Sequence, residues 1–511
     1  MARCSPPTAD SLAVGYWHGA CDFLKPMFPG NWVDSTPVGF FLRALRPGRA
    51  GVGAFVLLSL TALDLKADIF VPADFATIQA AINAASPGDV IHLAAGRYAE
   101  TLTINKTLTL TGSSATNCTV YSSTNIPLVN ITGPGTVTLA NFEINGGNYA
   151  FGGYNGTSFQ GIVATNVNLV LDTMVANQII NYMVTVVNGT IAATNVALWT
   201  RNLLVQCDVG FQLKGCTGTI SQLTQDGGRI DHTININATP AGFSNVTIEN
   251  SRIRTSSGSY GNCIRTYVNA SVRVSNCYLY RAAGETVPAY PAFNHSGISV
   301  NGYSNTVVIA GNTISNQPWA MYFYGSPGIG GNQLLVESNR ILNSTIGGIV
   351  WDGMNYKGVD LGGGLGSRGG NVFSEAPAPP STFFNDVLFT NSSTYSSANI
   401  FALHNTWSNP GNRESVIFDK LDNTNSGRLL TDDLVIKTFT LDASRRPVLS
   451  WNERGAGEKY TVEVCTNLEA PNWTNAPGSW PITNALLADK FWTNPAALSA
   501  NVFYRLRSVV P

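Results

Sequence analysis

The sequence predicts an all-β chain whose main part is a parallel β-helix, and three observations favour this fold class. An octet of alternating apolar residues, broken by a polar corner, recurs between residues 137 and 341. Gly, Asn, Thr and Ser are abundant and only 12% of the residues are charged, which suits strands and tight turns better than helices. One short amphipathic helix precedes the octets, and no comparable helical pattern follows it.

The octet reads apolar, any, apolar, two of any, a turn-like residue, any, apolar. Its copies begin at Val137, Leu169, Val196, Val246, Val272, Val307 and Leu334, with a poorly matching copy expected near Ile220. Alternation indicates a short strand and the polar position a bend. Because one copy cannot bury its apolar side chains, the copies must stack, and Asn312 and Asn339 then fall in a column of side-chain amides. An antiparallel sandwich is the alternative, but hairpin dipeptides are sparse.

A short helix is expected at the start of the stack. Asp74 is placed to cap it, and Pro87-Gly88 to end it. The end of a stacked solenoid exposes apolar and unpaired groups, so we expect this helix to cover that end. Four residues form its apolar face: Ile78, Ala81, Ile82 and Ala85.

Residues 43–67 have the layout of a secretory signal, with an arginine-rich start, an apolar run and a small residue at the end. The apolar run is too short to span a bilayer, although a buried core helix is an alternative. Residues 1–42 have no assigned role and would be explained by a mis-called start codon. We therefore expect a secreted protein, extracellular or on the cell surface, with no membrane span in its mature part.

Two stretches resemble a known family. "VPADFATIQAAINAASPGDVIHLAAGRYAETLTINKTLTLTG" resembles the cap and first coils of the pectin-lyase-like superfamily of right-handed β-helix proteins. "VDLGGGLGSRGGNVF", from Val359, resembles the closing coils of exported bacterial β-helix proteins. The resemblance implies a right-handed β-helix with an N-terminal capping helix over residues 68–430. It is far less specific for activity, because the catalytic motifs of pectin methylesterases and polygalacturonases are missing.

Residues 431–511 follow a different pattern, with alternating strands that resemble a small fibronectin-like β-sandwich. Its expected core residues are Trp451, Tyr460, Val462, Val464, Trp473 and Tyr504.

Export permits disulfides, and two pairs are close enough in sequence to form them: Cys207 with Cys216, and Cys263 with Cys277. A reduced, buried thiol is an equal alternative for the second pair.

A strip of outward polar residues is the first candidate site. Aligning the segments that begin at Ile264, Ile298, Met321 and Ile349 turns one alternate set outward: Arg265, Tyr267, Ser299, Asn301, Tyr322, Tyr324, Val350 and Asp352, with His295 just before it. Tyr rings stack on sugars, Arg binds uronate carboxylates, and Asp serves as a base or a calcium ligand. We therefore predict catalytic roles for Arg265 and Asp352. Substrate binding is predicted for Tyr267, Asn301, Tyr322, Tyr324 and His295. A solvated face with tyrosine ladders is the alternative.

The segment "QDGGRIDH" is the second candidate site. Asp226 and Asp231 are predicted calcium ligands, and Arg229 and Asp231 predicted catalytic residues, beside His232. The alternative is a turn at Asp-Gly-Gly with a solvated flank.

Together these features predict an exported β-helix protein that binds an acidic polysaccharide. If it is an enzyme, it is a polysaccharide lyase or a glycoside hydrolase, with calcium as the only cofactor suggested. The alternative is a non-catalytic surface, adhesion or structural protein. A net charge of −1 gives no general attraction to nucleic acid. We expect a monomer.

Overall fold

The computed structural model describes residues 66–509 apart from internal segments. The segments outside the description are 123–126, 147–159, 201–205, 241, 256–260, 283–294, 326–331, 353–357, 365, 375–384, 392–398, 411–412, 420–421, 423–426, 432–435, 453–458, 479, 483–489 and 498–501. The leader predicted over residues 1–42 and all but the last two residues of the predicted signal segment, 43–67, also lie outside the described residues.

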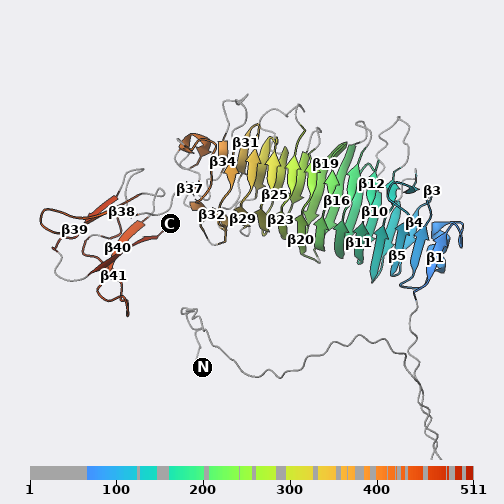
Figure 1. Cartoon of the computed structure of the whole chain (residues 1–511), viewed down its shortest axis with the longest axis horizontal. Helices are drawn as coiled ribbons and strands as arrows, with labels where there is room; N and C mark the ends of the chain where they lie inside the picture. Colours follow the sequence, from blue (N-terminus) through green and yellow to red (C-terminus); the bar gives the residue numbers. More distant parts are fainter. Residues whose placement is uncertain are drawn as a thin grey trace, which may run out of the picture. The chain divides into compact units, whose positions relative to one another are not determined.

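Three long parallel sheets make up the main part of the described chain (Figure 1). Sheet A has 14 strands: β1 (Asp68–Val71), β2 (Val90–Leu93), β5 (Leu108–Gly112), β8 (Thr136–Ala140), β11 (Asn168–Asp172), β14 (Thr190–Thr194), β17 (Thr217–Ser221), β20 (Ser244–Glu249), β23 (Ala270–Ser275), β26 (Thr306–Ala310), β29 (Gln333–Glu337), β32 (Val359–Gly362), β35 (Asn399–Ala402) and β37 (Arg428–Leu430). Sheet B has 11: β3 (Gly96–Ala99), β6 (Cys118–Tyr121), β9 (Glu143–Asn145), β12 (Val175–Asn177), β15 (Ala197–Trp199), β18 (Thr224–Gln225), β21 (Arg252–Arg254), β24 (Tyr278–Tyr280), β27 (Thr313–Ser315), β30 (Arg340–Leu342) and β33 (Val372–Phe373).

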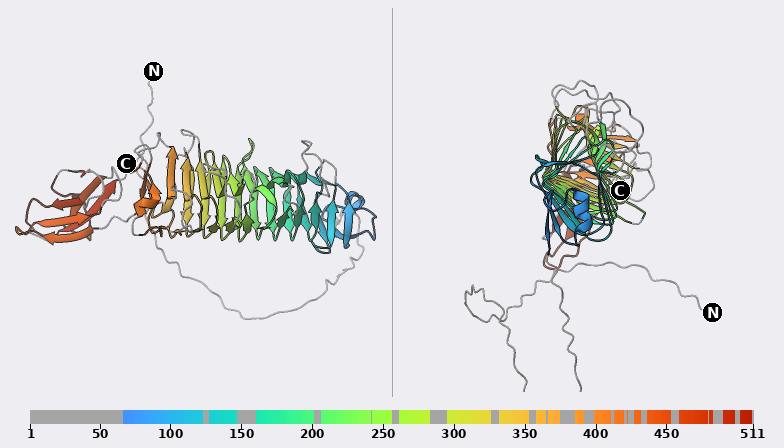
Figure 2. Two further views of the ribbon diagram at one scale, coloured as in Figure 1. Left: turned by 90° about the horizontal axis from the view of Figure 1, so that it is seen from above. Right: turned by 90° about the vertical axis from the view of Figure 1, so that its right-hand side faces the viewer.

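Sheet C has 12 strands and carries the first candidate site. They are β4 (Leu102–Ile104), β7 (Val129–Thr132), β10 (Gln160–Thr165), β13 (Tyr182–Val187), β16 (Gln206–Lys214), β19 (Arg229–Asn237), β22 (Gly261–Thr266), β25 (His295–Asn301), β28 (Trp319–Tyr324), β31 (Gly347–Asp352), β34 (Asn385–Asn391) and β36 (Ile417–Phe418), the last preceded by the 3-10 helix η1 (Arg413–Val416). From β4 to β33, each turn of the chain passes through sheets C, A and B in that order, and its strands pair in parallel with those of the next turn (Figure 2). This is the predicted right-handed parallel β-helix, and the antiparallel alternative for this region is excluded.

The octets stack as predicted, with one exception. Val246, Val272, Val307 and Leu334 are register partners in four neighbouring strands of sheet A. The octet assigned to Val196 is wrong, because the residue paired with Leu169 is Ile191, in β14. Ile191, Ala193 and Leu198 fill the apolar positions of the octet, and they lie in β14 of sheet A and β15 of sheet B.

The poorly matching copy near Ile220 is present as β17. Gly218 stands there at the register position of Ile191 and Val246. Its φ is +140°, and a Cβ at this position would overlap the carbonyl oxygen of Ile191. The octet therefore fails at this copy because only glycine fits where the two backbones approach so closely.

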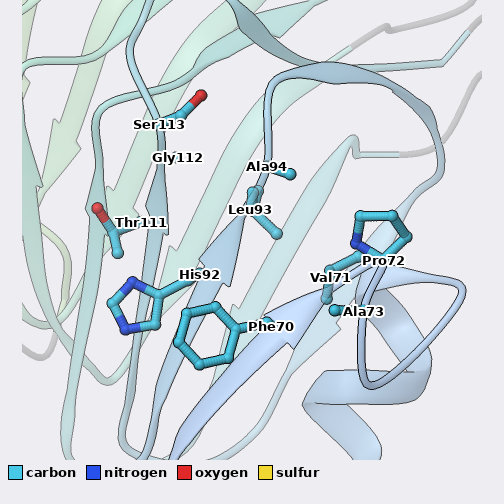
Figure 3. A pocket seen from close by; sticks show the side chains of 10 residues that line it. All are labelled: Phe70, Val71, Pro72, Ala73, His92, Leu93, Ala94, Thr111, Gly112 and Ser113. Carbon is cyan, nitrogen blue, oxygen red and sulfur yellow. The ribbon is translucent and has the colours of Figure 1, made fainter.

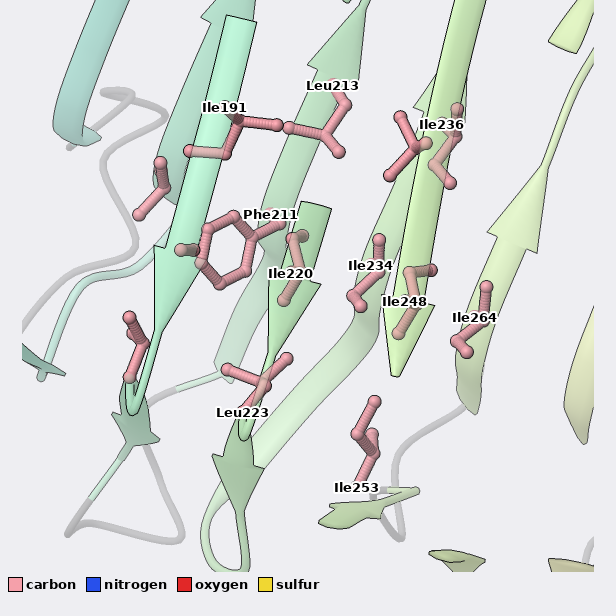
Figure 4. Packing of buried hydrophobic residues seen from close by; sticks show 14 of the residues in the cluster. Ile191, Phe211, Leu213, Ile220, Leu223, Ile234, Ile236, Ile248, Ile253 and Ile264 are labelled. Carbon is pink, nitrogen blue, oxygen red and sulfur yellow. The ribbon is translucent and has the colours of Figure 1, made fainter. Parts of the chain in front are cut away.

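Apolar side chains of all three sheets point into one continuous interior. In the middle coils, Phe211, Ile234 and Ile264 of sheet C face Ile220 and Ile248 of sheet A across this interior (Figure 4). All five side chains are fully buried. Burial of this size contributes about 1.5–3 kcal/mol for each side chain, so the stacked octets supply the main stabilisation of the solenoid.

The capping helix α1 (Ile78–Ala84) is present, but its cap differs from the prediction. Thr77, not Asp74, is the N-cap residue, and its Oγ1 accepts a hydrogen bond from the backbone N–H of Ala80 at 3.2 Å. The carboxylate of Glu100 accepts from the N–H groups of Ile78 and Gln79 at 2.9 and 3.0 Å. Asp74 instead accepts from the N–H of Phe70. The predicted apolar face is buried: Ile78, Ala81, Ile82 and Ala85.

The predicted amide column is confirmed and is longer than expected. The amide oxygen of Asn339 accepts from the backbone N–H and Nδ2 of Asn312, both at 3.0 Å. The oxygen of Asn371 accepts in the same way from Asn339 at 3.1 and 3.0 Å, and that of Asn405 from Asn371 at 2.9 and 2.9 Å. This ladder satisfies the buried backbone at the same corner of successive coils.

The "VDLGGGLGSRGG" segment is organised around Asp360. Its buried carboxylate accepts four backbone N–H bonds, from Gly362, Gly364, Gly366 and Ser367, at 2.9 to 3.1 Å. The glycines allow the backbone to wrap closely around a single carboxylate.

After β37 the strands become antiparallel. One sheet contains β38 (Ile436–Leu441), β39 (Pro447–Trp451) and β42 (Lys490–Thr493), and another contains β40 (Lys459–Cys465), β41 (Thr474–Asn475) and β43 (Phe503–Val509). Trp451, Tyr460 and Val462 belong to their common core, with Val464 and Tyr504 packed against it. The prediction for Trp473 is wrong, because its ring lies outside this core, under the guanidinium of Arg505 at 4.4 Å.

The six cysteines of the described chain are free thiols, all of them buried: Cys118, Cys207, Cys216, Cys263, Cys277 and Cys465. Among the described residues, no helix has the length and apolar character needed to span a bilayer.

Candidate functional site

The outer face of sheet C carries the predicted strip in the predicted register. Ile264, Ile298, Met321 and Ile349 are register partners. The first outward row is therefore Arg265, Ser299, Tyr322 and Val350, and the second, where Tyr267 follows β22, contains Tyr267, Asn301, Tyr324 and Asp352. Four strands, β22, β25, β28 and β31, thus bring side chains from about ninety residues of sequence onto one face.

Arg265 is the centre of the polar part of this strip. Its guanidinium lies 4.3 Å above the ring of Tyr267. The amide oxygen of Asn301 accepts from Nε at 2.9 Å and from Nη2 at 3.2 Å, while the amide nitrogen of Asn301 donates to Ser299 Oγ at 3.0 Å. Nη1 of Arg265 donates to Nε2 of His232 at 3.0 Å. Three side chains, those of Tyr267, Asn301 and His232, therefore fix the guanidinium.

One edge of this guanidinium is left for a ligand. An arginine has five N–H groups, and the bonds to Asn301 and His232 use three of them. Among the described residues, no carboxylate pairs with Arg265 and no other group accepts from it. The two remaining N–H groups, on Nη1 and Nη2, form the fork that binds a carboxylate through two parallel bonds. Burial lowers the pKa of Arg265, yet arginine remains a cation in proteins.

His232 lies beside Arg265, and both of its ring nitrogens face donors. Nε2 faces Nη1 of Arg265, and Nδ1 faces Nδ2 of Asn262 at 3.3 Å. The Asn262 amide is fixed in this orientation, because its oxygen accepts from the backbone N–H and the hydroxyl of Ser296 at 3.1 and 2.6 Å. Burial lowers the pKa of His232 to about 4, with Arg265 and His295 acting in the same direction. The ring is therefore neutral at pH 7.

The later part of the strip is aromatic and partly closed. The Tyr322 hydroxyl donates to Asp352 at 3.2 Å, and burial, followed by the charge of Asp352, raises the pKa of Tyr322. Tyr322 stacks on Tyr324 with 6.2 Å between ring centroids. Tyr324 is 45% exposed, whereas Tyr322 belongs to a buried cluster with Trp319 and Val350. Tyr324 thus offers the accessible ring.

Asp231 and His295 are buried at the edge of the polar part. The pairing of His232 with Asn262, and of Gly261 with His295, puts Asp231 and His295 in one row with Gly261 between them. Asp231 is 8% exposed and His295 2%. Both therefore lie behind the surface that Arg265 and Tyr267 present.

Asp226 is separated from this group. It follows β18 of sheet B, where its carboxylate accepts from the Tyr280 hydroxyl and lies 3.6 Å from Nε of Arg252. Asp231 belongs to sheet C, and the described residues contain no cluster of three His, Cys, Asp or Glu side chains suited to a metal. The donor set therefore does not fit the calcium site suggested by the sequence. Arg229 begins β19, but its side chain lies outside the described residues.

Two groups of polar residues on this face were not among the predicted site residues. Asn262 and Ser296 hold His232 as described above. Gln212 and Asn235 extend the Arg265 row toward the start of the solenoid, and the Asn235 amide donates to Gln212 Oε1 at 3.0 Å. Extending the alignment of strand segments backward to "FQLK", from Phe211, and "INI", from Ile234, would have identified Gln212 and Asn235.

The comparisons with known proteins concern the fold. No protein-family model matches the sequence, and no curated protein matches it. Among solved structures, a polygalacturonase from Erwinia carotovora ssp. carotovora is 13% identical, covering 63% of this chain and 92% of that one, with a TM-score of 0.42. ORF18 of Geobacillus virus E2 is 13% identical and covers 83% and 76%, with a TM-score of 0.36. A GH87 alpha-1,3-glucanase catalytic unit from Streptomyces thermodiastaticus is 15% identical and covers 69% and 64%, with a TM-score of 0.37. This chain is a parallel β-helix protein, as its own three sheets show.

The β-helix protein also has a shallow hollow of about 360 Å³ at its first coils (Figure 3). Phe70 stacks on His92 there with 4.9 Å between ring centroids, and Nε2 of His92 pairs with Asp68 at 2.8 Å. The remaining lining is mainly apolar. Because its ionisable group is already paired, this hollow has less to offer a charged ligand than the Arg265 strip.

Proposed function

We propose that this β-helix protein is exported and binds an acidic polysaccharide along the outer face of sheet C. The observation that carries the proposal is the half-buried Arg265, whose Nη1/Nη2 edge has no partner among the described residues. A buried cation is costly unless it is paired. A carboxylate or sulfate of a ligand would supply the pair.

The neighbouring side chains suit a sugar chain. Tyr324 offers an exposed aromatic ring two strands from Tyr267, and successive strands are about 4.8 Å apart. When one sugar of the polymer is bound at Arg265, a later sugar of the same polymer therefore lies within reach of Tyr324. A bidentate, charge-assisted pair with Arg265 contributes about 1.5–3 kcal/mol. Its loss corresponds to roughly ten- to hundredfold weaker binding.

The finer proposal is that the bound polymer is cleaved as in a polysaccharide lyase. In such a β-elimination, a base removes the proton beside the uronate carboxylate, the bond to the leaving oxygen breaks, a C=C bond forms, and the leaving oxygen takes up a proton. Arg265 would hold the carboxylate, and the predicted carboxylates on the same sheet are Asp231 in β19 and Asp352 in β31. The second candidate is a non-catalytic surface or adhesion protein, which the buried apolar cluster around Trp319 and Val350 on the same face favours.

Affinity electrophoresis tests the binding proposal. Native gels would contain polygalacturonate, alginate, a sulfated polysaccharide or a neutral glucan, with and without calcium. Arg273→Gln is the matched control for Arg265→Gln, because Arg273 lies in the next strand of the same turn, on the exposed outer face of sheet A. We expect an acidic polymer to retard the wild type and Arg273→Gln, and Arg265→Gln to bind at least tenfold more weakly. Equal retardation of all three proteins, or retardation by the neutral glucan alone, would contradict the proposal.

Ultraviolet absorbance of the unsaturated uronate product distinguishes a lyase from a non-catalytic binding protein. Absorbance that rises with time in the presence of a bound polyuronate supports the lyase. Retardation without any product, in either calcium condition, supports the non-catalytic protein.

A further inference from the structure

The contacts of His232 contain one donor too many. A neutral imidazole has one N–H and one acceptor nitrogen. Here the Nη1 group of Arg265 and the Nδ2 group of Asn262 both point at the ring, at 3.0 and 3.3 Å. Neither donor can turn into an acceptor, because a guanidinium has no acceptor and the Asn262 oxygen is held by two bonds from Ser296. One ring N–H therefore faces a donor, whichever nitrogen carries it.

The contact with Arg265 decides which nitrogen carries the proton when no ligand is bound. It is the shorter of the two contacts, and its donor is charged, so it is the stronger hydrogen bond. Nε2 is then the acceptor, and the proton is on Nδ1, facing the Asn262 amide. Protonation of the second nitrogen cannot relieve this conflict, because it would place a cation beside Arg265.

We propose that His232 and Arg265 form one oxyanion site, in which a ligand oxyanion accepts from the Arg265 fork and from Nε2–H of His232. This inference rests on the function proposed above and adds a second residue and a tautomer change to it. With the anion in place, both N–H groups of Arg265 Nη1, including the one that had faced Nε2, donate to ligand oxygens, and the ring proton moves by solvent exchange from Nδ1 to Nε2. Nδ1 is then free to accept from Asn262. Every donor in the group has an acceptor, and no proton is gained or lost overall.

The ligand group that fits is a compact oxyanion on a sugar. A uronate carboxylate and a sulfate ester share this chemistry, since both offer several oxygens to converging donors. The neutral ring of His232 adds a donor without adding charge. The site therefore selects for a singly charged oxyanion in a partly buried position, and a sugar with hydroxyl groups alone would leave Arg265 without its counter-charge.

The tautomer of His232 can be measured directly in the full-length protein. The chain has only five histidines, so nitrogen-15 labelling of histidine gives few ring signals, and the signal lost in His232→Gln identifies the ring. Spectra would be recorded at pH 7 without ligand, and with saturating oligogalacturonate, its carboxyl-reduced counterpart and a sulfated neutral oligosaccharide. We expect the His232 ring to change from Nδ1–H to Nε2–H when a charged oligosaccharide binds. With the carboxyl-reduced oligosaccharide, we expect it to keep Nδ1–H. A ring that keeps its tautomer when the charged ligand is bound would overturn the inference.

Two substitutions provide an independent test. His232→Gln keeps a side chain that can donate to the anion and accept from Arg265, whereas His232→Leu can do neither. We expect Gln to bind within about threefold of wild type and Leu to bind at least tenfold more weakly. If both bind as the wild type does while Arg265→Gln is defective, His232 has no part in the site and only this inference fails. If no acidic oligosaccharide binds the wild type, the proposed function fails with it. If neither His232 variant folds, the wild-type spectra still show whether the tautomer changes. The His232 ring is then identified as the one whose nitrogen signals shift in the Asn262→Ala variant.

Discussion

Replacing Asn339 by alanine should destabilise the solenoid far more than its size suggests. The Asn339 side chain is fully buried, and its oxygen accepts from the backbone N–H and Nδ2 of Asn312. Its nitrogen donates to the carbonyl groups of Ile309 and Glu337 at 2.8 and 3.0 Å and to Asn371 at 3.0 Å. A buried group left without its partner costs about 1–3 kcal/mol, and an ordinary hydrogen bond contributes about 1 kcal/mol. The orphaned N–H of Asn312 and the other lost bonds together predict a loss of about 3–5 kcal/mol.

Urea unfolding followed by far-ultraviolet circular dichroism measures this loss. Asn245→Ala is the matched control, because Asn245 lies on the exposed outer face of β20 and makes no side-chain hydrogen bond among the described residues. The control should change the free energy of unfolding by less than about 0.5 kcal/mol. A loss below about 1 kcal/mol for Asn339→Ala would refute the reasoning, since the corner amides would then contribute no more than surface residues.

Three further predictions concern other parts of the molecule. Gly218→Val restores the octet pattern but should lower the free energy of unfolding by more than about 3 kcal/mol in urea melts, because the new side chain would overlap the backbone of β14; a stabilised variant would contradict this. Asp360→Ala removes the acceptor of four backbone N–H groups and should raise amide exchange across residues 360–367 by at least tenfold, with unchanged exchange contradicting the role of the carboxylate. His232 should destabilise the fold at low pH: its pKa is lowered by burial, Arg265 and His295 to about 4, so the unfolded chain takes up a proton below about pH 6.5 and the folded protein does not. Stability should therefore fall by up to about 3 kcal/mol between pH 6.5 and 4, and His232→Gln should lose this part of the pH dependence.

Most of the fold could be predicted from the sequence because the apolar pattern repeats. The alignment of Ile264, Ile298, Met321 and Ile349 needed only a period of two and a bend at a fixed distance, and the structure has that register. The Val196 octet failed because two overlapping starts fit the same pattern. The choice between the two starts depends on which residues of the neighbouring coils they pair with, and the sequence of a single octet does not contain that information.

The candidate site was predictable only in part, for a different physical reason. Alternation says which side of a sheet a residue faces, and it correctly turned Arg265 and Tyr322 to the same side. It does not say whether that side is covered, so the burial of Tyr322 could not be foreseen. The donor conflict at His232 depends on the amide of Asn262 and on Ser296, which holds that amide in place, and both residues come from other coils. No local motif around His232 carries that information.

A crystal structure with an oligogalacturonate tests the central claim most directly. The account predicts a carboxylate within hydrogen-bond distance of Nη1 and Nη2 of Arg265 and of Nε2 of His232, with the sugar chain running toward Tyr324. A ligand bound elsewhere, for example in the hollow beside Phe70, with Arg265 still bonded only to Asn301 and His232, would contradict it.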